Sequence, residues 1–345
     1  MTAAVLRVAG RIGAALVALL GASLISFVFL RALPSNPARL ILGRFASDEA
    51  IADLERELGL HLPPWQQYLQ YIGDFVTGDW GHSYAAGVPV RELLLSRLPA
   101  SLELGLFAFT GALVGAALTA LLVSYRRRKW LDRTVQGGTA VGLGMPEFWL
   151  ATLLLVVFSE RLGWFPLPEG RLSQGAAPPP EVTGFTTVDA ILSGDAPLFL
   201  DALHHLILPA IALGLFSYCY LTRLLRSNLL EVAHQPYLLV HQAFGRTRWS
   251  AFWRSGLPNA MGSTIAAAGI TLGQLVAGAV LVESVFQWPG IGSLIVTGIQ
   301  TQDYSVVQSF ILLTAAGYIA INLIADLIVS RLDPRSAQAV VRMGM

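Results

Sequence analysis

Charged residues are scarce in this chain. Aspartate, glutamate, lysine and arginine make up 13% of its 345 residues, whereas a soluble domain typically contains about 25%. The apolar share is 54% and the net charge is +1, so the chain lacks the polar surface of a globular protein and the positive charge of a nucleic-acid binder. The composition also excludes a disordered chain and a disulfide scaffold. What remains is a polytopic membrane protein.

Cysteine and lysine are scarcer still, with one residue of each. Cys219 lies in an apolar run and cannot form a disulfide within the chain, so we expect a buried structural thiol. Lys129 follows three arginines and precedes Trp130. It is therefore not part of a Gly-x4-Gly-Lys-Ser/Thr loop, in which the lysine reaches the phosphates of ATP. We expect that this chain does not hydrolyse ATP by that route.

Other catalytic patterns are missing as well. The sequence contains neither the His-Glu-x-x-His motif of metalloproteases nor the Gly-x-Ser-x-Gly motif of serine hydrolases. His204 and His205 are adjacent, and neighbouring residues on a helix point about 100° apart, which favours packing or an interfacial role over a metal site. We therefore predict no enzyme, no catalytic residues and no metal site.

Long charge-free runs predict six membrane-spanning helices and an all-α fold. A helix needs about 20 apolar residues to cross a bilayer. The runs are 12–30, 104–125, 134–159, 202–222, 255–282 and 304–325. The first is longer than the apolar core of a signal peptide, so we expect it to be retained. An even number of spans places both termini on the same side.

The distribution of basic residues predicts on which side of the membrane the two termini lie. Fifteen of the 23 lie in the two terminal tails and in the loops after the second and fourth spans. The other eight share the opposite side with most of the acidic residues, and the segment 283–303 contains no lysine or arginine. Because cytoplasmic loops carry an excess of lysine and arginine, both termini are expected in the cytoplasm.

The spans divide the chain into four parts. They are residues 1–31 with the first span, an external segment 32–101 with short helices, a core 102–335 with five spans and a cytoplasmic loop at about 223–256, and a tail 336–345. In the external segment, Ser47 or Asp48 is expected to cap a short helix that ends near Gly59. The later outer loop 160–201 contains Pro178-Pro179-Pro180 and is expected to be irregular.

One carboxylate interrupts a predicted span. Glu147 lies near the middle of 134–159 and follows Pro146, which should bend the helix. A charge at that depth marks a functional site or is paired inside the helix bundle, and the sequence leaves both readings open. Glu103 and Glu283 lie at span ends and are expected to be interfacial. The Gly-x3-Gly pairs at 111/115 and 269/273 are expected to allow close helix packing.

The cytoplasmic segment 223–259 is too long for a simple turn. It combines an amphipathic pattern with basic residues, which suits a docking helix for a cytoplasmic partner or a helix that lies on the lipid headgroups. Its part 235–245 resembles the cytoplasmic EAA loop of bacterial ABC importer permeases of the dipeptide/oligopeptide/nickel family, and Gly245 matches the glycine of that motif. An ordered set of further matches extends the resemblance over nearly the whole chain: Pro34-Ser35-Asn36-Pro37, Gly78-Asp79-Trp80-Gly81, Ser83-Tyr84, Phe148-Trp149, His205 to Pro209, Glu283 to Gly292, Asn322 to Asp326 and Leu332 to Arg335.

The resemblance implies the type I importer permease fold and half of a translocation path in the bacterial plasma (inner) membrane. The partners would be a second homologous permease, two cytoplasmic ATPase subunits that use ATP and Mg²⁺, and an external solute-binding protein, while this chain would bind no cofactor itself. Small peptides are the expected cargo. The alternatives are nickel chelates or another small solute, or a secondary transporter, for which the sequence lacks the inverted repeats.

The resemblance also implies roles for particular residues. Those expected to couple the chain to the ATPases are Tyr237, Leu239, Val240, Ala243, Phe244, Gly245 and Arg246. Those expected along the translocation path are Glu147, Phe148 and Trp149. Those expected at an external gate or in contact with the binding protein are Glu283, Phe286, Trp288, Pro289 and Gly290.

Overall fold

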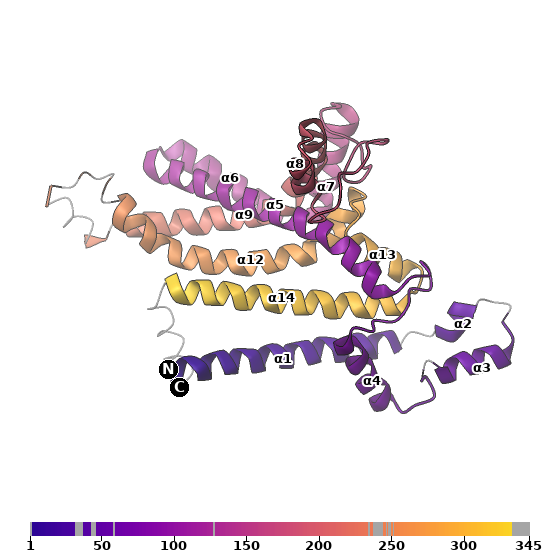
Figure 1. The fold of residues 1–345 in the computed structure, drawn as a ribbon. Helices are drawn as coiled ribbons and strands as arrows, with labels where there is room; N and C mark the ends of the chain where they lie inside the picture. Colours follow the sequence, from indigo (N-terminus) through magenta and orange to yellow (C-terminus); the bar gives the residue numbers. More distant parts are fainter. Residues whose placement is uncertain are drawn as a thin grey trace. The chain divides into compact units, whose positions relative to one another are not determined.

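The computed structural model of this chain is helical (Figure 1). It describes residues 2–31, 37–42, 46–57, 59–126, 128–233, 235–236, 244–245, 247, 250 and 252–332. Within these ranges the strand-type pairing is one isolated bridge between His82 and Pro89. The expected all-α membrane fold is thereby confirmed.

The elements follow in this order: α1 (Thr2–Arg31), α2 (Pro37–Leu42), α3 (Asp48–Glu57), α4 (Pro64–Thr77), α5 (Val90–Arg126), α6 (Lys129–Gly144), α7 (Glu147–Leu154), the π-helix η1 (Leu155–Arg161), α8 (Thr186–Leu192), α9 (Ala196–Val232), the π-helix η2 (Phe252–Gly256), α12 (Leu257–Val285), α13 (Ile291–Gln300) and α14 (Tyr304–Leu332). Several are longer than the apolar runs that predicted them. The extra turns carry polar residues, which a helix tolerates once it has left the apolar part of the membrane.

Helices α5, α9 and α14 are long and apolar enough to cross a membrane. Two bent pairs raise that number to as many as five among the described residues: α6 with α7 and η1, and the two parts of α12. In α1 the described apolar stretch is Leu16–Val28. The third predicted span is therefore not one helix, because its two parts meet at 106°.

The chain forms two compact units, of which the first comprises Met1–Pro99 and Pro289–Ile319. In this unit α4 lies beside the C-terminal half of α1 (Figure 1). The hydroxyl groups of Ser23 and Tyr68 lie 2.7 Å apart, and the Tyr71 hydroxyl donates to the Gln308 carbonyl of α14 over 3.2 Å. Two tyrosines on one face of α4 thus attach it to α1 and to α14.

The motif at 78–84 forms an ordered turn in this first unit. Asp303 is 1% exposed, and its carboxylate accepts hydrogen bonds from the Ser83 hydroxyl at 2.6 Å and from the Ala85 N–H at 3.3 Å. Gly78 and Gly81 both have positive φ, which a residue with a side chain would adopt only with strain. The motif therefore holds the turn against the start of α14.

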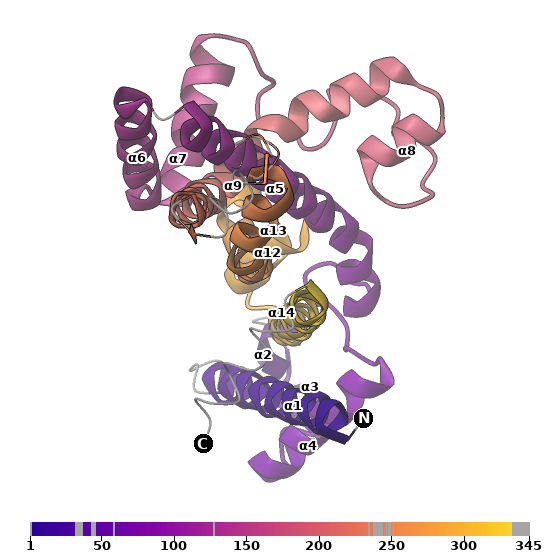
Figure 2. The same ribbon diagram turned by 90° about the vertical axis from the view of Figure 1, so that its left-hand side faces the viewer.

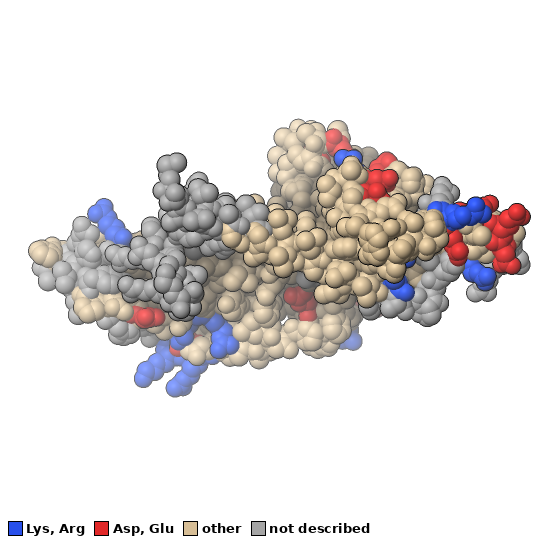
Figure 3. Space-filling view, turned by 90° about the horizontal axis from the view of Figure 1, so that it is seen from below, with Lys and Arg blue, Asp and Glu red and all other residues tan. Residues whose placement is uncertain are grey.

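Helix α3 begins and ends at the predicted capping residues. The Ser47 hydroxyl accepts the Ala50 N–H at 3.2 Å, and Gly59 has a φ of +65° just after the helix. Charged side chains gather over α3, at the right-hand end of Figure 3. Such a helix is suited to water rather than to the bilayer.

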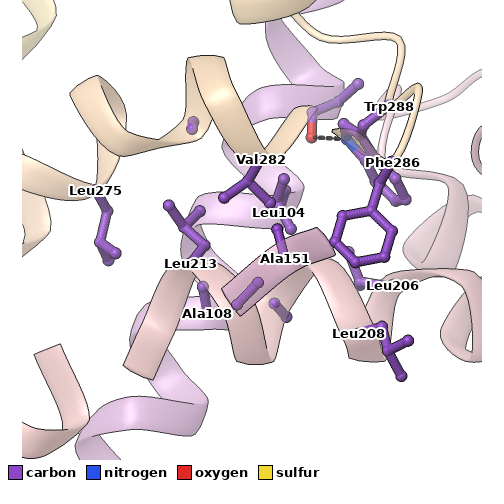
Figure 4. Close-up of a cluster of buried hydrophobic side chains, with 14 residues drawn as sticks. Leu104, Ala108, Ala151, Leu206, Leu208, Leu213, Leu275, Val282, Phe286 and Trp288 are labelled. Atoms are coloured by element: carbon purple, nitrogen blue, oxygen red, sulfur yellow. Dashed lines mark hydrogen bonds between the residues drawn. The ribbon is translucent and has the colours of Figure 1, made fainter. Parts of the chain in front are cut away.

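The second unit comprises Ala100–Trp288 and Ala320–Met345 and is built around α9. Figure 2 shows α5, α6, α7 and α12 around this helix. Its main buried cluster includes Leu104, Leu206, Leu213, Val282 and Trp288 (Figure 4). Helices α5, α7, α9 and α12 thus supply one apolar core.

Close helix packing occurs at one of the predicted glycines, Gly115, and at two that were not predicted. A Cβ on Gly214 of α9 would lie 2.8 Å from the Ala108 carbonyl oxygen of α5, and one on Gly142 would lie 2.5 Å from the sulfur of Cys219. Nothing lies within 4 Å of the corresponding position at Gly111, so the prediction for this residue is wrong, whereas Gly115 contacts the Tyr218 ring. Cys219 is buried, as expected.

The loop 160–201 is more ordered than its prolines suggested. It contains α8 and the start of α9. The carboxylate of Asp189, in α8, accepts hydrogen bonds from the Thr183 N–H and hydroxyl at 2.8 and 2.7 Å and from the Gly184 N–H at 3.0 Å. The proline run is irregular, but a buried carboxylate organises the chain that follows it.

Candidate functional site

Glu147 lies at a break between two helices. Met145 has extended backbone angles, Pro146 precedes the first residue of α7, and that residue is Glu147. A proline has no N–H and forces the preceding residue out of the helical conformation, which ends α6 at Gly144. The expected bend is therefore a complete break, and Glu147 begins a new helix instead of interrupting an old one.

The carboxylate of Glu147 rests directly on α12. A Cβ on Gly278 would collide with the Oε2 atom of Glu147, so glycine at this position lets the carboxylate lie against the α12 backbone. Helix α12 bends by 50° between Leu275 and Gly278. A break in one helix and a bend in another thus meet at a single acidic side chain.

The two aromatic residues that follow are open. Phe148 is 50% exposed and Trp149 is 47% exposed, whereas Leu150 and Ala151 are 8% and 0% exposed. The first turn of α7 therefore has one face against the core and another that no described part of the chain covers. The structure places the three predicted path residues together but leaves their role a prediction.

The C-terminal end of α12 is joined to α5 by buried polar contacts. Glu283 is 0% exposed and its Oε1 atom accepts a hydrogen bond from the Ser101 hydroxyl at 2.6 Å. Trp288 is 1% exposed and its Nε1–H donates to the Ala100 carbonyl at 2.8 Å (Figure 4). The Glu283 carboxylate is therefore buried and hydrogen-bonded within the helix bundle, while its expected position at the membrane interface stays a prediction.

Glu103 is buried in the same way, and its expected position at the membrane interface likewise stays a prediction. It is 2% exposed, pairs with the Arg171 guanidinium and accepts both the N–H and the hydroxyl of Thr187 at 2.8 and 2.6 Å. Arg171 also lies over the Trp288 ring, with its Cζ 5.9 Å from the ring centre. Sequence reasoning missed Arg171, because its partner Glu103 lies 68 positions away in the chain.

Burial limits how far the residues predicted for an external gate or for contact with a binding protein can reach another protein. Glu283, Phe286 and Trp288 are at most 6% exposed, so their side chains offer little surface to a separate protein. Gly290 caps α13, and Pro289 is half-buried. The burial of Glu283, Phe286 and Trp288 therefore favours a gate or framework role over direct contact with a binding protein. The role of all five residues stays a prediction.

The predicted coupling segment is described at its exposed turn. Phe244 is 84% exposed, and Gly245 has a φ of +81° with nothing within 4 Å of the position of a Cβ. The other predicted coupling residues, Tyr237, Leu239, Val240, Ala243 and Arg246, lie outside the described residues. Gly245 thus adopts a conformation that other residues rarely adopt, at a point open to a partner.

The two helices that flank the coupling segment are fastened to each other. The Asn228 side-chain amide of α9 lies within hydrogen-bond distance of three α12 oxygens, those of the Ala260 carbonyl at 3.2 Å, Ser263 at 2.8 Å and Thr264 at 3.1 Å. Arg226 of α9 forms a two-pronged ion pair with Asp132 of α6. Sequence reasoning missed both residues, because only the fold brings their partners close.

The adjacent histidines act separately. The Nε2 atom of His204 lies 2.7 Å from the Trp164 carbonyl oxygen, and the Nδ1 atom of His205 lies 2.9 Å from that of Asp201. Each ring thus bonds a different backbone carbonyl, as the packing reading predicts.

Comparison with known proteins places the whole chain in one class. Residues 109–338 match the family described as "binding-protein-dependent transport system inner membrane component", and residues 5–105 match the N-terminal family of such membrane components.

Three relatives illustrate the similarity. The dipeptide transport system permease protein DppB of Alkalihalophilus pseudofirmus is 37% identical over 317 residues, which cover 92% of this chain and 95% of that protein. The probable D,D-dipeptide transport system permease protein DdpB of Escherichia coli K12 is 38% identical, with 91% and 92% covered. The di/tripeptide transport system permease protein DppB of Pseudomonas aeruginosa is 35% identical, with 95% and 97% covered.

The matches extend over nearly the full length of the chain and of these relatives. They agree with the helical, apolar structure and with the ordered motifs from residue 34 to residue 335. This chain therefore belongs to the family of inner membrane components of binding-protein-dependent transport systems.

Proposed function

We propose that this chain forms half of the translocation path of an ATP-driven importer of dipeptides and similar small peptides. The observation that carries the proposal is the similarity, over more than 90% of the chain, to permeases that are named for dipeptide or di/tripeptide transport. Those names favour peptides over the nickel chelates that the wider family also carries.

The energy source lies in other chains under this proposal. The sequence has no phosphate-binding lysine loop. Two ATPase subunits, with ATP and Mg²⁺, would therefore dock on the coupling segment around Gly245, whose exposed turn suits such a contact. Because that side must be cytoplasmic, both termini lie in the cytoplasm, in agreement with the distribution of basic residues.

The remaining components follow from the half-path. A second homologous permease supplies the other half, and an external solute-binding protein delivers the peptide. The nucleotide-bound ATPases favour one of two pore conformations, and movement of the coupling segment shifts the balance between them. Helices α9 and α12 move together in this scheme, since Asn228 joins them at the base of the segment.

A substitution at Gly245 tests the coupling role. Gly245→Asp places a side chain at a φ of +81° and a charge on the exposed turn. We expect the reconstituted complex to assemble but to lose peptide uptake and the ATPase stimulation that loaded binding protein causes.

Gly175→Asp is the matched control, because Gly175 has a φ of +86°, also has nothing within 4 Å, and lies in the outer loop. It should leave coupling unchanged. Normal stimulated ATPase activity in Gly245→Asp would contradict the assignment.

A further inference from the structure

Glu147 has no hydrogen-bond or ion-pair partner within the described part of the chain. It lies at the middle of the apolar run 134–159. An unpaired charge is costly within the apolar part of a membrane. A partner from outside the described chain would remove that penalty.

The fully buried glutamates of this unit have partners, unlike the partly buried Glu147. Glu103 is satisfied by Arg171 and Thr187, and Glu283 by Ser101. Glu147 instead faces the bare backbone of Gly278, between Leu275 and Ala279, which are 3% and 4% exposed. The chain thus supplies donors to its framework carboxylates and leaves this one open.

The backbone around Glu147 is that of a site rather than of a framework. Helices α6 and α7 meet at 106° immediately before it, and α12 bends by 50° beside it. Irregular backbone at membrane depth persists where it lines a cavity or is enclosed by protein, and broken helices of transporters border their substrate sites near the midplane. The half-exposed Phe148 and Trp149 leave the adjoining face of α7 uncovered.

We propose that Glu147, positioned by Gly278, binds the α-ammonium group of the peptide as it passes through the membrane. The inference rests on the proposed function, because it requires a peptide cargo. An ammonium group offers three donors and a positive charge, and its charge-assisted hydrogen bonds to a carboxylate are among the strongest available in a protein. A basic side chain of the second permease is the competing partner, and the first experiment distinguishes the two.

The first experiment measures access to the carboxylate. The complete complex in proteoliposomes is treated with dicyclohexylcarbodiimide, which enters membranes and modifies carboxyl groups, and modification of Glu147 is followed by mass spectrometry. We expect L-alanyl-L-alanine on both sides of the membrane to lower modification several-fold. N-acetyl-L-alanyl-L-alanine, which lacks the ammonium group, should not lower it.

Three results would overturn the proposal. Equal protection by the acetylated peptide would show that the ammonium group is not what is recognised. Undiminished modification in the presence of dipeptide would show that cargo does not reach the side chain. Complete resistance to modification without cargo would assign Glu147 to a permanent pair with the second permease.

The second experiment measures uptake, with the binding protein kept constant. Glu147→Gln should lower L-alanyl-L-alanine uptake about tenfold, as the loss of a charged hydrogen bond predicts, whereas Glu147→Asp should retain part of it. Gly278→Ala should also lower uptake, but by less, because its Cβ would push the Glu147 carboxylate away from its position against α12 without removing it.

The matched controls are Glu181→Gln, in the exposed outer loop, and Gly137→Ala, where nothing lies within 4 Å. Both should transport normally. Absence of dipeptide uptake by the unmodified complex would contradict the proposed function itself, whereas normal uptake by Glu147→Gln would contradict only the ammonium site.

Discussion

The contact between Gly214 of α9 and Ala108 of α5 makes a quantitative prediction. A Cβ on Gly214 would lie 2.8 Å from the Ala108 carbonyl oxygen. Ordinary contact begins at 3.4 Å, so Gly214→Ala requires the two helices to separate by about 0.6 Å. The obstacle is backbone, which cannot rotate away as a side chain would.

The expected size follows from two opposing effects. A gap of about 0.5–1 Å forfeits a quarter to a half of the dispersion energy across a contact, and overpacking of this kind costs about 1–3 kcal/mol. Alanine gains about 1 kcal/mol over glycine in a helix interior. Gly214→Ala should therefore range from neutral to about 2 kcal/mol destabilising.

Gly111→Ala on α5 is the matched control, because nothing lies within 4 Å of its Cβ position. It receives the same gain in helix propensity without the clash, so it should be neutral or stabilising. The difference between the two variants should be about 1–3 kcal/mol. Equilibrium unfolding of the purified protein in detergent measures it, and a Gly214→Ala variant as stable as Gly111→Ala would refute the close approach of α5 and α9.

Two further predictions concern the coupling base and the outer loop. Asn228→Ala removes the amide donors that lie close to three α12 oxygens, and it should lower the amount of peptide taken up per ATP hydrolysed. Ser227→Ala, at the neighbouring exposed position, should leave this ratio unchanged. An unchanged ratio in Asn228→Ala would exclude Asn228 from coupling. Burial raises the pKa of Asp189, but the hydrogen bonds from Thr183, Gly184 and Val182 outweigh it and hold that pKa below its ordinary value. Its contribution to stability is therefore complete above the unfolded pKa of about 3.9 and is lost as the pH falls through the lower native value. Hydrogen exchange of residues 182–189 should show protection at neutral pH that disappears in strong acid, and Asp189→Asn should remove it at every pH.

Local sequence patterns predicted a large part of this structure. Apolar runs located the helices, and the motifs at 78–84 and 283–290 coincide with ordered turns. The position of the break at Pro146 was also predicted, because proline acts on its own residue and the one before it. The angle of 106° between the two helices was not predicted, because it depends on the helices against which α7 packs.

The acidic residues show where sequence reasoning stops. A glutamate at a span end is expected in the interface, because burial of an unpaired charge is costly. Glu103 is buried within the protein, where Arg171 is brought to it from 68 positions away. Such compensation is invisible in the sequence until the fold is known.

The sequence by itself determined the class of protein, the helices and the family, because hydropathy, proline and motif order depend on residues close together in the chain. The tertiary structure decided which carboxylates are satisfied and which is open. The sequence shows no partner for Glu103, Glu147 or Glu283, but in the structure the first and last meet donors while Glu147 meets a glycine. The physical reason is that the free energy of a buried charge depends on atoms within a few ångströms of it, and those atoms come from distant parts of the chain.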